Sequence, residues 1–107
     1  MDPKLEELIF TTIANAGESR SDSKAAIEAA KAGNYEEAEK MLEEADRTML
    51  LAHKAHTDIL YQSVNSAEMP MTFLMAHASN HLSEAETTRD LADVYISIIK
   101  EVRKVNG

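Results

Sequence analysis

The chain has 107 residues, a formal net charge of −8 and no cysteine. A chain of this size and charge is expected to form one domain, and it is a poor candidate for binding nucleic acid or anionic membrane surfaces. Without cysteine it has no disulfides, thiolate nucleophiles or thiolate metal sites. Three glycines, two prolines and many alanines and glutamates predict an all-α fold. No apolar run reaches the ~18 residues that span a bilayer, and the acidic N-terminus does not resemble a signal peptide. A cytoplasmic protein is therefore expected.

The first helix is expected to begin at Asp2-Pro3 and to end near Ala32. A carboxylate at the cap and proline at the first helical position are typical of a helix start. Gly17 interrupts the pattern and costs about 1 kcal/mol relative to alanine, but the periodicity resumes after it, so we expect one helix that can bend there. The residues predicted to share its buried face are Leu5, Leu8, Ile9, Thr12, Ile13 and Ala16.

Gly33-Asn34 separates the first helix from the second. Glycine suits the left-handed position after a helix, and Asn34 can cap the next helix with Glu37 three residues on. The acidic run over residues 36–46 indicates a solvated outer face. The residues predicted to line the inner face are Tyr35, Ala38, Met41, Leu42, Ala45, Met49, Ala52, His56, Ile59 and Leu60.

Residues 63–70 are expected to connect to a third helix that begins at Pro70 and runs to Asn106. Neither glycine nor proline interrupts the segment from Met71 to Asn106. Short connections between three helices predict an antiparallel up-down-up three-helix bundle. The core stripe expected on the third helix consists of Leu74, Ala78, Leu82, Ala85, Leu91, Tyr95, Ile98, Val102 and Val105.

Chemistry is expected where His77 and His81 lie one turn apart on the third helix, in a polar stripe with Glu84. Imidazole is a nucleophile, a metal ligand and the side chain that titrates near neutral pH. A single helical histidine is more often a packed or surface residue, but a pair at this spacing could bind zinc or nickel with Glu84 as third ligand. A zinc-protease signature would need glutamate directly after the first histidine, where Ala78 stands.

Four segments of the chain resemble one family. Residues 76–82 (AHASNHL) resemble the HAQDHL signature of the lactose/cellobiose (chitobiose) class of enzyme IIA, a component of the bacterial phosphoenolpyruvate:sugar phosphotransferase system. Residues 16–21 (AGESRS) are similar to its AGxARS segment, and residues 30–39 (AKAGNYEEAE) to its AxxGdfexAe stretch. Residues 52–60 (AHKAHTDIL) are similar to its AHxxQTxLI stretch. The order and spacing agree over nearly the whole chain.

The resemblance implies a phosphoryl carrier that forms a parallel homotrimer packed along the third helices. In this family the carrier HPr phosphorylates a histidine of IIA, which passes the group to a cysteine of IIB, and IIB phosphorylates the sugar entering through IIC. The resemblance places the nucleophile at His77 and gives His81 a supporting role. It implies one IIA domain over residues 1–107, no cofactor, and uptake of a lactose/cellobiose/chitobiose-type sugar.

Two departures from the family pattern bear on the site. The Gln-Asp pair of the signature is Ser79-Asn80 here, and the QT pair is His56-Thr57. The resemblance implies that the family aspartate lies on the trimer axis, where three carboxylates share a divalent cation. Because Asn80 is neutral and supplies no compensating charge, we expect a trimer without an axial metal. The altered residues leave open a regulatory paralogue with changed relay activity.

Two other classes of helical protein remain as alternatives. Residues 30–45 also resemble a hairpin of tetratricopeptide or microtubule-interacting type, which would make the chain a non-catalytic interaction module; a chain of three helices lacks the stacked repeats. A two-component histidine phosphotransfer domain usually has four helices and a lysine shortly after its histidine, and residues 79–89 contain no lysine. Labelling with phosphoenolpyruvate, enzyme I and HPr separates the three, because only the IIA hypothesis predicts label on this chain.

Overall fold

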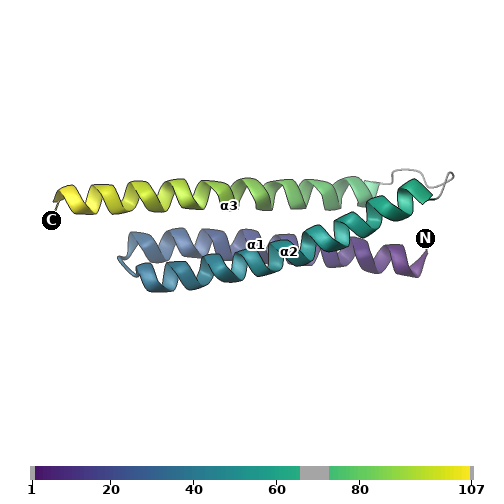
Figure 1. Ribbon diagram of the computed structural model, residues 1–107, viewed down its shortest axis with the longest axis horizontal. Helices are drawn as coiled ribbons and strands as arrows, with labels where there is room; N and C mark the ends of the chain where they lie inside the picture. The colour runs from purple at the N-terminus through teal and green to yellow at the C-terminus, as the bar shows by residue number, and fades with distance from the viewer. Residues whose placement is uncertain (1, 66–72, 107) are drawn as a thin grey trace.

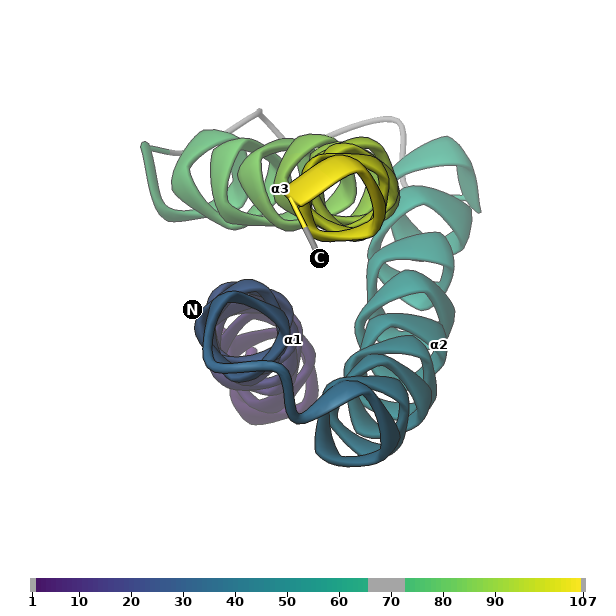
Figure 2. The same ribbon diagram turned by 90° about the vertical axis from the view of Figure 1, so that its left-hand side faces the viewer.

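The computed structural model describes residues 2–65 and 73–106, which form three long helices: α1 (Pro3–Lys31), α2 (Tyr35–Asn65) and α3 (Phe73–Asn106). α1 and α3 run in the same direction and α2 runs against them, in a rod of 61 × 17 × 16 Å (Figure 1). The predicted all-α, up-down-up three-helix bundle is confirmed. α2 is inclined: it begins beside the end of α1, and its later turns rise to the level of α3 in Figure 1 while lying to one side of it in Figure 2.

The predicted start of the first helix and the predicted boundary at Gly33-Asn34 agree with the observed ones. The Asp2 carboxylate accepts a hydrogen bond from Lys4 N at 3.1 Å, and Pro3 follows it as the first residue of α1. Gly33 has φ +85°, the left-handed conformation that favours glycine. α1 continues as a helix through Gly17. α2 extends to Asn65, into the predicted connection, and the predicted start of the third helix at Pro70 lies outside the described residues.

α1 is the helix on which the other two pack. Its first half contributes leucine and isoleucine side chains to the core, and its second half contributes only small ones, which let α2 approach closely. In this region Ser19 Oγ donates a hydrogen bond across the interface to Ala45 O at 2.7 Å. The predicted face is confirmed, with Ile13 only partly buried; the buried residues of α1 are Leu5, Leu8, Ile9, Thr12, Ala16, Ser19, Ser23, Ala26 and Ala30.

The second half of α3 differs from the prediction. Ala92 and Ile96 are buried there, with Ile99 packed beside them. The sequence carries two apolar stripes on this half of the helix, and α1 and α2 cover only one of them. The residues predicted as core but exposed are Leu91, Tyr95, Ile98, Val102 and Val105, called the open stripe below. In the first half, Ala78, Leu82 and Ala85 are buried as predicted, and Leu74 packs against the core.

Candidate functional site

His77 and His81 lie on the outer side of α3, above a buried face. Ala78 and Leu82 directly follow them in the sequence and are both buried. Because successive helical residues are rotated by about 100°, this burial turns His77 to the exposed surface and leaves His81 partly exposed. The core beneath them therefore fixes the direction in which both imidazoles project.

The two imidazoles contact each other directly. His77 Nε2 and His81 Nε2 are 3.1 Å apart, and the rings meet edge to face with centroids 4.5 Å apart. One ring must donate its N–H and the other must accept, so the pair shares one proton between the two Nε2 atoms. Phe73, one turn before, stacks on His77 with ring centroids 5.8 Å apart and an interplanar angle of 10°. The His77 ring is thus held between Phe73 and His81, with one edge open to solvent.

Glu84 does not serve as the third metal ligand considered from the sequence. Its carboxylate instead lies 3.8 Å from Arg20 of α1. Within residues 2–65 and 73–106, no group of three histidine, aspartate or glutamate side chains is arranged to hold a metal ion. Among these residues Glu84 therefore does not complete a three-ligand set with His77 and His81. Asn80 lies on the exposed side of α3 beside the histidine pair.

The two histidines of α2 make separate contacts with α3. His53 Nε2 lies 2.8 Å from a Glu86 carboxylate oxygen, and His56 Nε2 lies 2.8 Å from Ser79 Oγ. Burial lowers the pKa of His56, and the charge of His53 lowers it further against the opposing effect of Glu86. The contact between His56 and Ser79 was not foreseen. Its only signal in the sequence was that both residues depart from the family pattern.

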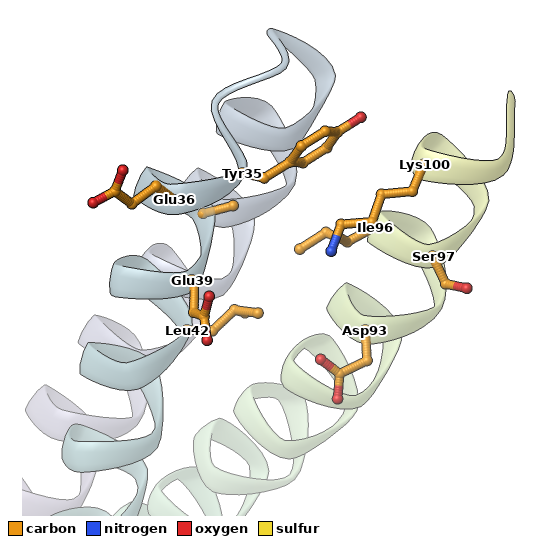
Figure 3. Close-up of a pocket in the computed structure, with 9 residues that line it drawn as sticks. Tyr35, Glu36, Glu39, Leu42, Asp93, Ile96, Ser97 and Lys100 are labelled. Atoms are coloured by element: carbon orange, nitrogen blue, oxygen red, sulfur yellow. The ribbon is translucent and has the colours of Figure 1, made fainter. Parts of the chain in front are cut away.

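A groove of about 650 Å³ lies between α2 and α3, in the part of the bundle away from the histidines. Tyr35, Leu42 and Ile96 line it, and Lys100 Nζ stands 5.2 Å from the centroid of the Tyr35 ring (Figure 3). The carboxylates of Glu36, Glu39 and Asp93 also line it. None of the four histidines belongs to this groove, so it is separate from the candidate site.

Among the described residues, no helix combines the length and apolar character that crossing a membrane requires.

Comparison with known proteins identifies the family of the chain. The sequence model of the family described as "PTS system, Lactose/Cellobiose specific IIA subunit" matches residues 7–100. The lichenan-specific phosphotransferase enzyme IIA component of Bacillus subtilis (strain 168) is 35% identical over 107 residues, covering 100% of this chain and 97% of the relative. The PTS system lactose-specific EIIA component of Lacticaseibacillus casei is 30% identical over 98 residues, covering 92% and 88%.

The fold has a solved counterpart in the same family. The crystal structure of the PTS cellobiose-specific enzyme IIA from Bacillus anthracis superposes with a TM-score of 0.89 at 28% identity, covering 97% of this chain and 95% of that one. Sequence model, relatives and structure agree over nearly the full length. The chain therefore belongs to the lactose/cellobiose-specific IIA family of the phosphotransferase system and is a phosphotransferase component.

Proposed function

We propose that this protein carries a phosphoryl group on His77, accepting it from phospho-HPr and passing it to the cysteine of a cognate IIB. The relay would act in the cytoplasm and serve uptake of a lactose/cellobiose/chitobiose-type sugar, in keeping with the sugars named for the relatives. The observation that carries the proposal is the exposed His77 imidazole in contact with His81 at 3.1 Å between Nε2 atoms. This contact supplies a nucleophile with a hydrogen-bond donor beside it.

The transfer requires a neutral His77 with a free lone pair. As the lone pair attacks phosphorus, the bond from phosphorus to the donor breaks and the new N–P bond forms. If His81 donates its Nε2–H, the Nε2 of His77 carries no proton and the proton of His77 resides on Nδ1. The hydrogen bond must break to free the Nε2 lone pair for attack. The same His81 N–H can then turn to a phosphoryl oxygen. The mid-helix backbone amides are already bonded within α3, so stabilisation of the new phosphate must come from side chains such as this one.

Exposed apolar residues at the same end of the bundle support docking of partner proteins there. Phe73 is 81% exposed and begins α3, and Tyr61 is exposed near the end of α2. Leu60, which was predicted to line the inner face of α2, is exposed instead. The last turns of α2 and the first turn of α3 lie at the same end of the rod (Figure 1). Exposed apolar side chains at the same end of the bundle as a reactive group can form the apolar part of a docking surface for partners that bind and then leave. HPr and IIB are proposed to use it in turn.

The assembly proposed is a parallel homotrimer along α3. The open stripe advances in alternating steps of four and three residues, the spacing of a coiled-coil seam. Continued towards the start of α3, the same steps reach Thr88, Glu84, His81 and His77 in turn. A second and third copy packed on the open stripe would therefore bring neighbouring subunits close to each histidine pair. Side chains of those subunits could then contribute to binding the phosphate.

The test is transfer of ³²P from phosphoenolpyruvate through purified enzyme I and HPr. The parent should be labelled, and His77→Gln, which keeps a polar side chain of similar length, should fold normally and lose all label. His81→Gln should be labelled more slowly, because His77 remains as the nucleophile but the ring N–H donor of His81 is replaced by an amide on a more flexible side chain. Loss of label in His81→Gln with normal labelling of His77→Gln would reverse the assignment. A parent that is labelled but transfers nothing to a IIB cysteine would instead favour the regulatory paralogue.

A further inference from the structure

His56 and Ser79, two residues that depart from the family pattern, lie far apart in the sequence but are in contact in the structure. His56 Nε2 of α2 and Ser79 Oγ of α3 are 2.8 Å apart. Ser79 belongs to the helical turn that carries His77 and His81. A hydrogen bond to Ser79 is therefore a direct link between α2 and the segment of α3 that holds the proposed phosphoryl acceptor.

The link lies where a small rotation of α3 would matter. His77 and Ser79 are two residues apart, so their side chains project about 200° apart around the helix. Ser79 is partly buried on the α2 side while His77 faces solvent. Holding Ser79 against α2 thus fixes the direction of His77. The apolar neighbours Ala78 and Leu82 resist sliding but, being non-directional contacts, define the rotation less sharply than a hydrogen bond does.

The protonation state of His56 suits this role. Its partial burial and the nearby charge of His53 both favour the neutral imidazole, and the Glu86 carboxylate opposes them only in part. A neutral imidazole can either accept a hydrogen bond from the Ser79 hydroxyl or donate one from its own N–H to the hydroxyl oxygen. The bond therefore forms without burying a charge.

We propose that His56 is a positioning residue for phosphoryl transfer, which through its hydrogen bond with Ser79 orients the turn of α3 that carries His77 and His81. The inference rests on the proposed function only for its effect on the transfer rate. The orientation itself is a property of the free protein and can be measured without any phosphoryl donor.

The chain provides matched variants. Ser79→Ala removes the hydroxyl while leaving a residue of higher helix propensity, and His56→Ala removes the other partner. The double variant His56→Gln/Ser79→Gln restores a pair of side chains able to hydrogen-bond across the same interface. His53→Ala is the control, because the His53–Glu86 contact has the same length, 2.8 Å, and joins the same helices, but it ends away from the His77–His81 turn.

The first readout is ¹⁵N NMR of the imidazole nitrogens, which reports the tautomers of His77 and His81. Both single variants should shift these signals, and His53→Ala should leave them in place. The second is labelling by phospho-HPr. The rate at saturating donor should fall about fivefold, equivalent to one net hydrogen bond, with KM unchanged and with recovery in the double glutamine variant.

Unshifted His77 and His81 signals in folded His56→Ala and Ser79→Ala would overturn the positioning role, whatever the labelling shows. Equal effects of His53→Ala on signals and rate would overturn it too, because any contact between α2 and α3 would then serve. A parent that takes no label refutes the proposed function but leaves the NMR comparison intact. The two failures are thereby distinguished.

Discussion

α1 and α3 are helices of similar length with opposite relations to their surroundings. α1 has buried residues from Leu5 to Ala30. Among the described residues of α1, Phe10 is the only large apolar side chain that is exposed. α3 buries one face as far as Ile96 but leaves the open stripe uncovered, and Ile98 in its middle is 54% exposed. The contacts of α1 are completed within the chain. Those of α3 are not, and the uncovered face continues the line of the histidine pair.

The difference shows what an apolar face on a helix predicts. Burial of such a face is favourable by about 25 cal/mol per Å² of apolar surface, and that surface can be removed from water by the same chain or by another copy. In α1 only one face is apolar, so the core partner is unambiguous. In α3 two apolar stripes compete, and the stripe left over is the candidate for assembly.

The largest expected effect is loss of assembly when a charge is placed in the open stripe of α3. Ile98→Asp should convert the proposed trimer, of about three times the 11.8 kDa chain mass, into monomers. It removes three isoleucines from the seam, each worth about 1.5–3 kcal/mol, and adds three charges there. Multi-angle light scattering measures the mass, and circular dichroism checks that the monomer remains helical.

Ser97→Asp is the matched control, because it adds the same charge one residue away on the side of α3 that borders the groove. It should leave the mass unchanged. A parent that is monomeric at all concentrations, or a trimer that survives Ile98→Asp, would rule out the open stripe as the seam.

A smaller effect is expected at Asn80, where the resemblance places the trimer axis. Asn80→Asp should make thermal stability depend on a divalent cation, because three converging carboxylates repel unless a cation lies among them. Without metal the variant should melt below the parent at pH 7. Mutual repulsion raises the pKa of these carboxyls in the assembly, so its stability should recover as pH falls and they protonate.

The parent should melt at the same temperature with and without EDTA and contain little metal by elemental assay. Asn80→Ala, which adds no charge, should show no metal dependence either. Stoichiometric axial metal in the parent, with a lower melting temperature in chelator, would mean that another ligand such as His81 replaces the missing aspartate.

The same contrast explains how far the sequence alone could lead. Helix number and direction were predictable, as were the start of α1 and the boundary between α1 and α2, because Asp2-Pro3 and Gly33-Asn34 act locally. The core of α1 was predictable from a single apolar face. The core of α3 beyond Ala85 was not, because spacing does not say whether the chain or a copy covers Ile98. His77 and His81 were selected by resemblance and spacing, whereas the 2.8 Å contact of His56 with Ser79 depends on packing between helices 23 residues apart in sequence.

The smallest expected effect is a change in stability at two buried serines of α1, which tests whether the polar contacts of this helix are all made within the chain. Ser19 and Ser23 lie one turn apart and are both fully buried. Ser19 Oγ donates to Ala45 O at 2.7 Å, whereas Ser23 Oγ has no hydrogen-bond partner among the described residues. Both serines can be replaced by alanine with the same loss of volume and the same gain in helix propensity. The pair therefore isolates the value of one hydrogen bond.

Ser19→Ala removes a hydrogen bond worth about 0.5–1.5 kcal/mol, and Ser23→Ala removes a buried polar group whose desolvation costs about 1–3 kcal/mol. Ser23→Ala should therefore be the more stable of the two variants by about 1.5–4.5 kcal/mol and should exceed the parent, as measured by urea unfolding at one fixed protein concentration. Equal stabilities would mean that Ser23 Oγ is hydrogen-bonded in solution. In that case α1 would contain a polar contact that is not completed by its own chain, and its contrast with α3 would be one of degree.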